Sequence, residues 1–128
     1  FISGTCAVTY GNINYTGDSQ FPCAQKDNFQ SFASGFFVAP HTGDIRFYLD
    51  SDDSSHFSIT VGGAIREFSA DNGGSNANYS GFVKDQLYPI SVFFTERGGL
   101  ASWRLDYEFS GQARTPIPAS QLRPQWRV

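Results

Sequence analysis

The most regular alternation of apolar and polar residues runs through Ser102–Phe109, which reads Ser-Trp-Arg-Leu-Asp-Tyr-Glu-Phe. Such alternation predicts a β-strand with one buried face, because successive side chains of a strand point to opposite sides. The predicted inward positions are Trp103, Leu105, Tyr107 and Phe109. We therefore expect Trp103 to pack in the core rather than to stack on a ligand. Similar runs predict further strands at 6–10, 32–38, 44–49, 57–61, 64–68 and 88–95.

Turn signals separate these runs. Val61-Gly-Gly-Ala64 has the two glycines of a tight two-residue hairpin. Other breaks rich in glycine or proline lie at 40–43, 72–74 and 98–99. The polar segment 71–78 is expected to form a long exposed loop. Short strands divided by turns in this way predict an all-β fold, a sandwich or a barrel with one core.

Composition agrees with this fold class and limits the partners. Of the 128 residues, 13 are phenylalanine and 13 are glycine, which favours strands and turns over helices. The formal net charge of −3 and the pI near 5.1 exclude a broad electrostatic contact with nucleic acid. No apolar run approaches the ~18 residues that a transmembrane helix needs, so we expect no membrane insertion.

Cys6 and Cys23 are the only cysteines, and they flank a turn-rich stretch. We predict that they form a disulfide, which would indicate an oxidising compartment. A bridge that closes a loop of this size stabilises a fold by about 3 kcal/mol. Two separate thiols are the alternative, because one pair of cysteines does not by itself define a disulfide.

One acidic segment interrupts the alternation just after a predicted strand, Leu49-Asp-Ser-Asp-Asp-Ser-Ser-His56. Its three aspartates repel one another unless a cation or hydrogen-bond donors compensate. Ca²⁺ prefers such oxygen ligands, although the spacing is not that of an EF-hand. A solvated turn whose aspartates cap backbone N–H groups is the alternative. His56 and the neighbouring serines have no oxyanion motif, so we do not expect an enzyme.

Several motifs follow one another in a fixed order. The segment 34–59 contains Ser-Gly-Phe, Ala-Pro, Thr-Gly, a predicted strand and then Ser-Asp-Asp. Tyr88-Pro-Ile90, Glu96-Arg-Gly-Gly99 and Ile117-Pro-Ala-Ser-Gln-Leu122 come later in the chain. Over residues 32–124 this order resembles the PA14 domain family, first described in anthrax protective antigen. The resemblance implies one domain over 1–128, folded as a two-sheet antiparallel β-sandwich with jelly-roll character.

In the lectin branch of this family, which includes flocculins and adhesins, an Asp–Asp pair joined by a cis peptide binds Ca²⁺. The matching residues here are Asp52 and Asp53. The resemblance also implies main-chain ligands in the loop before the last strand, the carbonyl groups of Arg97, Gly99 and Leu100. The lectin branch usually supplies an Asn or Asp side chain from this loop, where Leu100 stands here, so one side-chain ligand is missing.

The resemblance thus implies a calcium-dependent carbohydrate-binding module, a lectin or adhesin, of a secreted or cell-surface protein. Its partners would be glycans or glycoproteins whose vicinal hydroxyls coordinate an ion held by Asp52 and Asp53. The segment 71–78 is either a plain exposed connection or a specificity loop that contacts the sugar through Asn72, Asn76 and Asn78. A structural or protein-interaction module of a larger extracellular protein is the alternative, as is a binding domain that accompanies a glycosidase.

Overall fold

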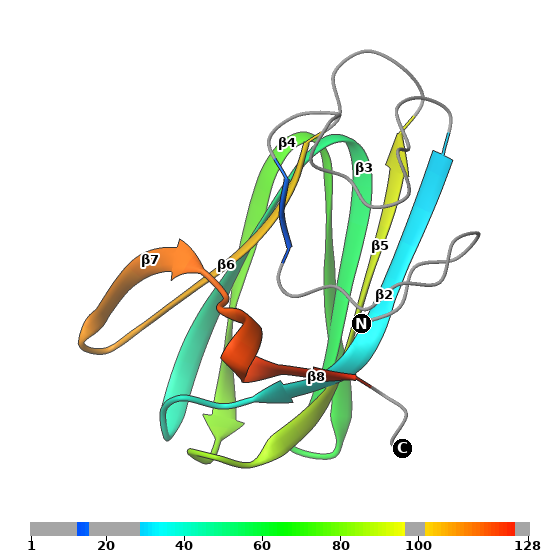
Figure 1. Ribbon diagram of the computed structural model, residues 1–128. Helices are drawn as coiled ribbons and strands as arrows, with labels where there is room; N and C mark the ends of the chain where they lie inside the picture. Colours follow the sequence, from blue (N-terminus) through cyan, green and yellow to red (C-terminus); the bar gives the residue numbers. More distant parts are fainter. Residues whose placement is uncertain (1–12, 16–28, 97–101, 125–128) are drawn as a thin grey trace.

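The chain is described by a computed structural model, in which residues 13–15, 29–96 and 102–124 are placed (Figure 1). These residues form antiparallel strands and one short 3-10 helix, so the predicted all-β class is confirmed. No helix in these ranges is long and apolar enough to cross a membrane. The elements are β1 (Asn14–Tyr15), β2 (Phe29–Val38), β3 (Gly43–Val61), β4 (Ala64–Phe82), β5 (Leu87–Glu96), β6 (Trp103–Phe109), β7 (Gln112–Pro116), η3 (Ala119–Gln121) and β8 (Leu122–Pro124).

The described strands form one continuous sheet with the order β1-β6-β3-β5-β2-β8. Strand β4 pairs with β3, and β7 pairs with β6, outside this path. The family resemblance implied a two-sheet antiparallel sandwich with jelly-roll character. The described strands stay hydrogen-bonded along one path, and this antiparallel sheet curls on itself (Figure 1). The curl replaces a second sheet, because it lets one sheet bury its own apolar face.

The longest element is the β3–β4 hairpin, in which each strand has 19 residues. Its turn is the predicted one, since Val61 pairs with Ala64 across Gly62 and Gly63. Both glycines have positive φ, 63° and 76°, which a two-residue turn that follows the twist of the strands requires. The sequence therefore located this hairpin correctly.

Strand β3 bends in its middle, between Ser51 and Ser54, where its register with β4 shifts. Before the bend it pairs with β6, and after the bend it pairs with β5. Figure 1 shows β3 and β4 rising to the upper end of the molecule, turning there and descending. The rings of Phe47 and Phe57, from the two halves of β3, lie 4.9 Å apart at their centroids. The two halves thus face each other across the core.

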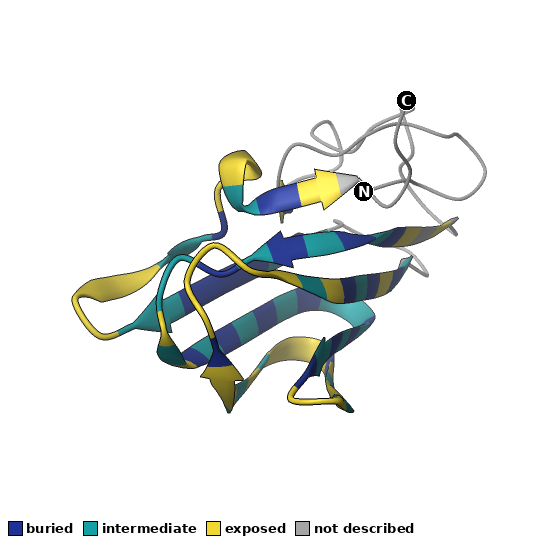
Figure 2. Cartoon of the chain, turned by 90° about the horizontal axis from the view of Figure 1, so that it is seen from below, coloured by how far each residue is buried: buried dark blue, intermediate teal, exposed yellow. Residues whose placement is uncertain are grey.

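The core is formed by alternate residues of these strands, whose burial appears as dark blue stripes along the ribbon in Figure 2. The predicted inward residues of β3 and β6 are buried, with Phe109 partly buried against them. Trp103 is fully buried and stacks on Phe94 at a centroid distance of 5.2 Å, so its predicted place in the core is confirmed. The largest side chains of this core are Phe37, Phe47, Phe57, Phe82, Phe94 and Trp103.

The segment 71–78 is not the predicted loop, because it lies within β4. Its backbone pairs with the middle of β3, for example Ser75 with Leu49 and Ala77 with Phe47. The residues that favour turns lie at the bend instead, where Asn72 and Gly73 have positive φ of 52° and 158°. Strand pairing with β3 has overridden the local preference of Asn and Gly for a loop.

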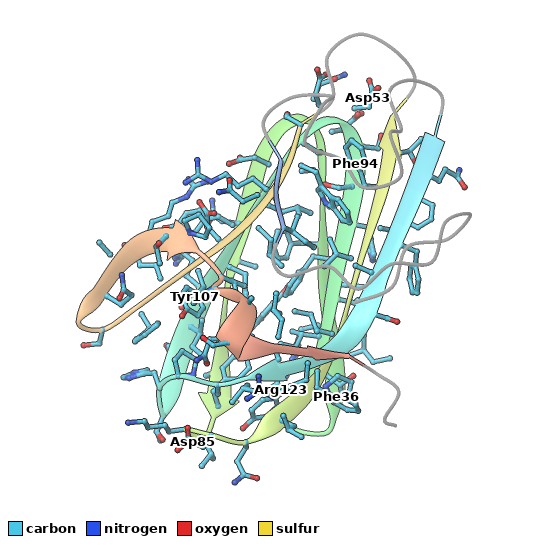
Figure 3. All side chains as sticks on the ribbon, viewed as in Figure 1. Phe36, Asp53, Asp85, Phe94, Tyr107 and Arg123 are labelled. Carbon is cyan, nitrogen blue, oxygen red and sulfur yellow. The ribbon has the colours of Figure 1, made fainter. Side chains whose placement is uncertain are left out.

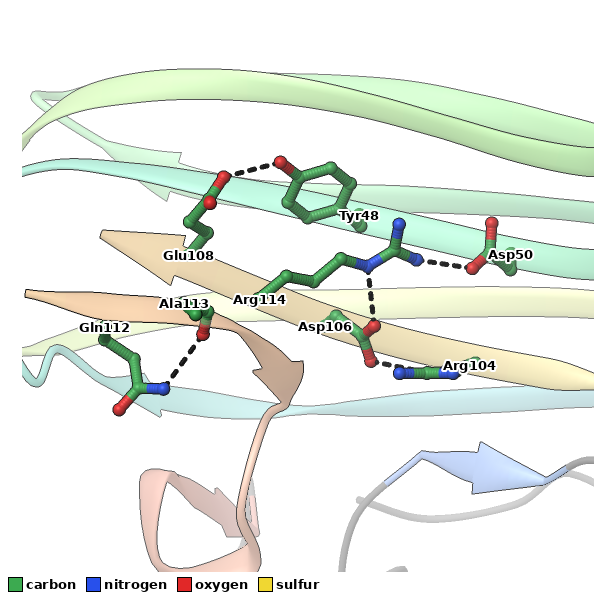
Figure 4. A network of polar contacts seen from close by, with 8 residues as sticks. All are labelled: Tyr48, Asp50, Arg104, Asp106, Glu108, Gln112, Ala113 and Arg114. Atoms are coloured by element: carbon green, nitrogen blue, oxygen red, sulfur yellow. Dashed lines mark hydrogen bonds and ion pairs between the residues drawn. The ribbon is translucent and has the colours of Figure 1, made fainter. Parts of the chain in front are cut away.

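Asp106 is buried although the alternation of β6 places it on the outward face. Strand β7 pairs with β6 along its edge and brings the side chain of Arg114 to this face, with Arg114 Nε 2.8 Å from Asp106 Oδ2 (Figure 4). Arg104 Nε lies 2.9 Å from the other carboxylate oxygen. The guanidinium carbon of Arg114 also lies 4.2 Å from the centre of the Tyr48 ring. Two cations thus compensate the charge of the buried carboxylate.

Candidate functional site

Asp52 and Asp53 lie at the bend of β3, in the one place where this strand changes partner. Ser51 is paired with Trp103 at the start of β6, and Ser54 is paired with Thr95 near the end of β5. Figure 3 shows Asp53 at the end of the molecule opposite to Asp85. The acidic pair therefore sits beside both ends of the connection between β5 and β6.

Backbone and hydroxyl groups hold the acidic pair in place. The N–H of Asp52 donates to the carbonyl of Ser102, at 3.0 Å. The hydroxyl of Ser51 donates to the carbonyl of Asp53 at 3.0 Å, and Ser55 donates to Ser51 at 2.9 Å. Both serine side chains are buried, so their hydrogen bonds hold the turn from the interior of the protein, while the aspartates stay partly exposed.

Asn72 lies directly beside Asp53, from the neighbouring strand. Its side-chain oxygen accepts the backbone N–H of Asp53 at 3.1 Å. The hydroxyl of Ser54 donates to Asp71 in the same way, also at 3.1 Å. Both Asp53 and Asn72 have left-handed backbone, with φ of 75° and 52°, which Asp and Asn tolerate better than most residues. The structure thus brings Asn72 to the acidic pair.

The predicted cis peptide is wrong, because no peptide bond within the described residues is cis. The chain turns at Asp53 through a left-handed residue and a shift of register instead. A bulge of this kind bends a strand without the roughly 3 kcal/mol that a cis bond between non-proline residues costs.

Asn76 and Asn78 lie away from the acidic pair, farther along β4. Arg46 donates to the side-chain oxygen of Asn76 at 2.6 Å, and Asn78 donates to Asp44 at 3.1 Å. Asn78 lies six positions along the strand from Asn72, which corresponds to about 20 Å. Of the three predicted asparagines, only Asn72 is next to Asp52 and Asp53.

The remaining predicted residues lie outside the described part of the chain: Arg97, Gly99 and Leu100 of the β5–β6 connection, and Cys6 and Cys23. Within the described part there is no cluster of three or more His, Cys, Asp or Glu side chains suited to a metal ion. Two adjacent carboxylates fit a calcium site only if further oxygens come from elsewhere, since Ca²⁺ takes 6–8 of them. Thr95 and Ser102, the described residues on the two sides of the β5–β6 connection, both meet the bend.

Sequence reasoning missed a hollow next to the acidic pair, on the side of the sheet that faces away from the core. Its volume is about 330 Å³. Nδ1 of His56 lies 2.7 Å from the hydroxyl of Ser69, and Nε2 lies 3.4 Å from Glu67. The serines that precede His56 in the sequence do not hydrogen-bond to it: Ser54 donates to Asp71, and Ser55 donates to Ser51. The lining includes Ser54, His56, Ser69, Asp71, Phe93 and Thr95, and strand alternation could have placed most of them on one face.

Known proteins are similar to this chain in structure but not in sequence. The sequence matches no protein-family model and no curated protein. An anti-sigma factor domain-containing protein superposes with a TM-score of 0.77 at 18% identity, covering 93% of this chain and 42% of that one. The A domain of epithelial adhesin 6 from Candida glabrata, solved with Galβ1-3GlcNAc, superposes with a TM-score of 0.72 at 16% identity, covering 88% and 64%.

A third similar structure is the PA14 sugar-binding domain from an RTX adhesin, with a TM-score of 0.59 at 17% identity, covering 88% of this chain and 75% of that one. The chain has the PA14 fold. The resemblance found in the sequence is therefore confirmed at the level of the fold. The chain spans about two fifths of the anti-sigma factor domain-containing protein, so the PA14 fold occurs there within a longer chain.

Proposed function

We propose that this chain is a single PA14-like domain over 1–128 that binds carbohydrate in a calcium-dependent manner, as a lectin or adhesin module of a secreted or cell-surface protein. The position of Asp52 and Asp53 carries the proposal, because two adjacent carboxylates lie at the bend of β3, beside both ends of the β5–β6 connection. Similar structures that are sugar-binding adhesin domains support a binding module rather than an enzyme.

In this proposal the carboxylates of Asp52 and Asp53 and the main-chain carbonyls of Arg97, Gly99 and Leu100 hold the ion. Bound calcium supplies coordination positions that two vicinal hydroxyls of a glycan or glycoprotein occupy. Asn72 would contact the same sugar in this proposal, and its hydrogen bond to the backbone N–H of Asp53 supports this role. Asn76 and Asn78 would contact only a ligand that extends along β4.

A structural role for the acidic pair is the second candidate. Asp53 and Asn72 both have left-handed backbone and are joined by a hydrogen bond, so they stabilise the bend without any ion. In that case the domain serves as a structural or protein-interaction module. Both candidates use the same residues, and calcium binding distinguishes them.

The Asp53→Asn variant tests the proposal, because asparagine keeps the tolerance for left-handed backbone and removes the carboxylate. With the wild type, millimolar CaCl₂ should raise the melting temperature by about 5 °C, and retention on a glycan array should require calcium. Asp53→Asn should lose both responses and still fold. Asp44→Asn is the matched control, since Asp44 is exposed at the far end of the same strand. If calcium leaves the melting temperature of the wild type unchanged, the structural role of the acidic pair is favoured.

A further inference from the structure

One part of the sheet surface carries no formal charge. We call it the neutral face: the outward side of 30–38, 54–60 and 87–95, which belong to β2, the second half of β3 and β5. These segments contain no Asp, Glu, Lys or Arg. The outward side of β6 and the first half of β3 differs completely, with Arg46, Asp50, Arg104 and Glu108 among its residues. Solvated faces of antiparallel sheets are usually polar, so the contrast within one sheet points to a ligand without charge.

Two exposed phenylalanines of the neutral face lie near the end of its strands that is beside the bend. Phe32 and Phe93 are directly opposite each other in the β2–β5 pairing. Their ring centroids are 6.4 Å apart, and 45% and 37% of their surfaces remain accessible. Large aromatic side chains seldom stay exposed side by side unless they contact a partner.

Hydroxyl groups and two hollows surround this aromatic pair. The hollow of about 330 Å³ described above has Phe93 in its wall, together with Ser54, Ser69 and Thr95, and its border includes His56 and the carboxylate residue Asp71 of β4. A second hollow of about 530 Å³ has Phe32 in its wall, together with Ser58 and Ser91, whose hydroxyls are 2.7 Å apart. Both volumes lie in the range of about 300–1,000 Å³ that small-molecule sites occupy.

We propose that the neutral face is a second carbohydrate-binding surface, which binds an uncharged glycan chain without calcium. The C–H side of a sugar ring packs on the negative face of a phenyl ring, and the serine and threonine hydroxyls donate to and accept from sugar hydroxyls. A protein partner fits less well, because serine is depleted at protein–protein interfaces. Each contact on such a shallow surface is weak, so a chain that covers both hollows binds better than one sugar.

Native gel electrophoresis through soluble neutral polysaccharides tests the proposal, with a mannan, a β-1,3-glucan, a xyloglucan and a galactomannan as probes and EDTA throughout. At least one of them should retard the wild type, whereas polygalacturonate should not. Phe93→Ala and Phe32→Ala should each weaken binding about tenfold, and Phe93→Tyr should retain it. Ile65→Ala is the matched control, because Ile65 is a large apolar residue 68% exposed on β4, outside the neutral face, and lines neither hollow.

Three results would overturn the proposal. The first is that none of the four polysaccharides retards the wild type in EDTA. The second is retardation that survives Phe93→Ala and Phe32→Ala. The third is a dimer in sedimentation experiments that Phe93→Ala disperses, which would make the face a self-association surface. The Asp53→Asn variant should keep the retardation in EDTA, so failure of the calcium site and failure of the neutral face give different results.

Discussion

At the scale of single residues, Gly74 shows how closely β3 and β4 approach each other near the bend. A Cβ atom at position 74 would meet the carboxylate oxygen Oδ1 of Asp50. Moving that carboxylate would disturb its ion pair with Arg114, whose Nη2 lies 2.6 Å from the other oxygen. Gly74 is therefore required by the Asp50–Arg114 ion pair and not by an unusual φ.

We predict that Gly74→Ala lowers the free energy of unfolding by about 1 kcal/mol, because Asp50 must leave Arg114 or the strands must separate. In an Asp50→Ala background the same substitution should be neutral or stabilise by about 0.5 kcal/mol, since alanine restricts the unfolded chain. Urea denaturation of the four proteins of this double-mutant cycle measures the difference. An equal cost in both backgrounds would show that Asp50 is not the obstacle.

At the scale of elements, two tyrosines on core-facing strands link packing to pH. Burial raises the pKa of Tyr107 on β6 and of Tyr79 on β4 above the ordinary 10.0. As the pH rises past 10, the unfolded chain loses these protons before the folded protein does, so stability falls. Below that pH the contribution of both groups is fully present.

We therefore expect the urea midpoint to decrease between pH 9.5 and pH 11, roughly the window around the ordinary tyrosine pKa. The Tyr79→Phe/Tyr107→Phe double variant should show a weaker decrease, because phenylalanine has no proton to lose. An unchanged pH dependence in the double variant would contradict the assignment.

Alternation predicted the inward faces of β3 and β6 because burial on one side of a strand forces a period of two. Ile45, Phe47 and Leu49 follow this rule, because alternation predicts that they face inward and all three are buried in the structure. The same rule could not show that Asp106 is buried, because its cover comes from Arg114, eight residues farther along the chain on another strand. It also could not extend β4 through Asn72 and Gly73, whose local preference is a turn.

The candidate site was partly predictable for a similar reason. The acidic composition of the segment around Asp52 and Asp53 identified the candidate site, and the order of the motifs indicated the PA14 fold. The bend at Asp53 and the contact with Asn72 depend on the register of two long strands, which the sequence does not state. Exposure of Phe32 and Phe93 was likewise hidden, because both belong to apolar runs that read as core strands.

At the scale of the whole molecule, the disulfide between Cys6 and Cys23 remains a prediction, since both residues lie outside the described part of the chain. Mass spectrometry of the denatured, non-reduced protein after thiol alkylation should find no label on either cysteine. Reduction should lower the free energy of unfolding by about 3 kcal/mol. Two alkylated thiols before reduction would refute the bridge and weaken the case for an oxidising compartment.

The long β3–β4 hairpin also has a consequence for the order of folding. Its pairs are nested around Gly62 and Gly63, so each new pair extends one already formed and closes only a small additional loop. We expect this hairpin to close from its turn outward, as a zipper, before β2 and β6 join it. The zipper must pass Asp53 and Asn72 to continue, and there the growing ribbon changes direction. Pairing beyond the bend is thus the step of folding that brings the two halves of the hairpin together around the core.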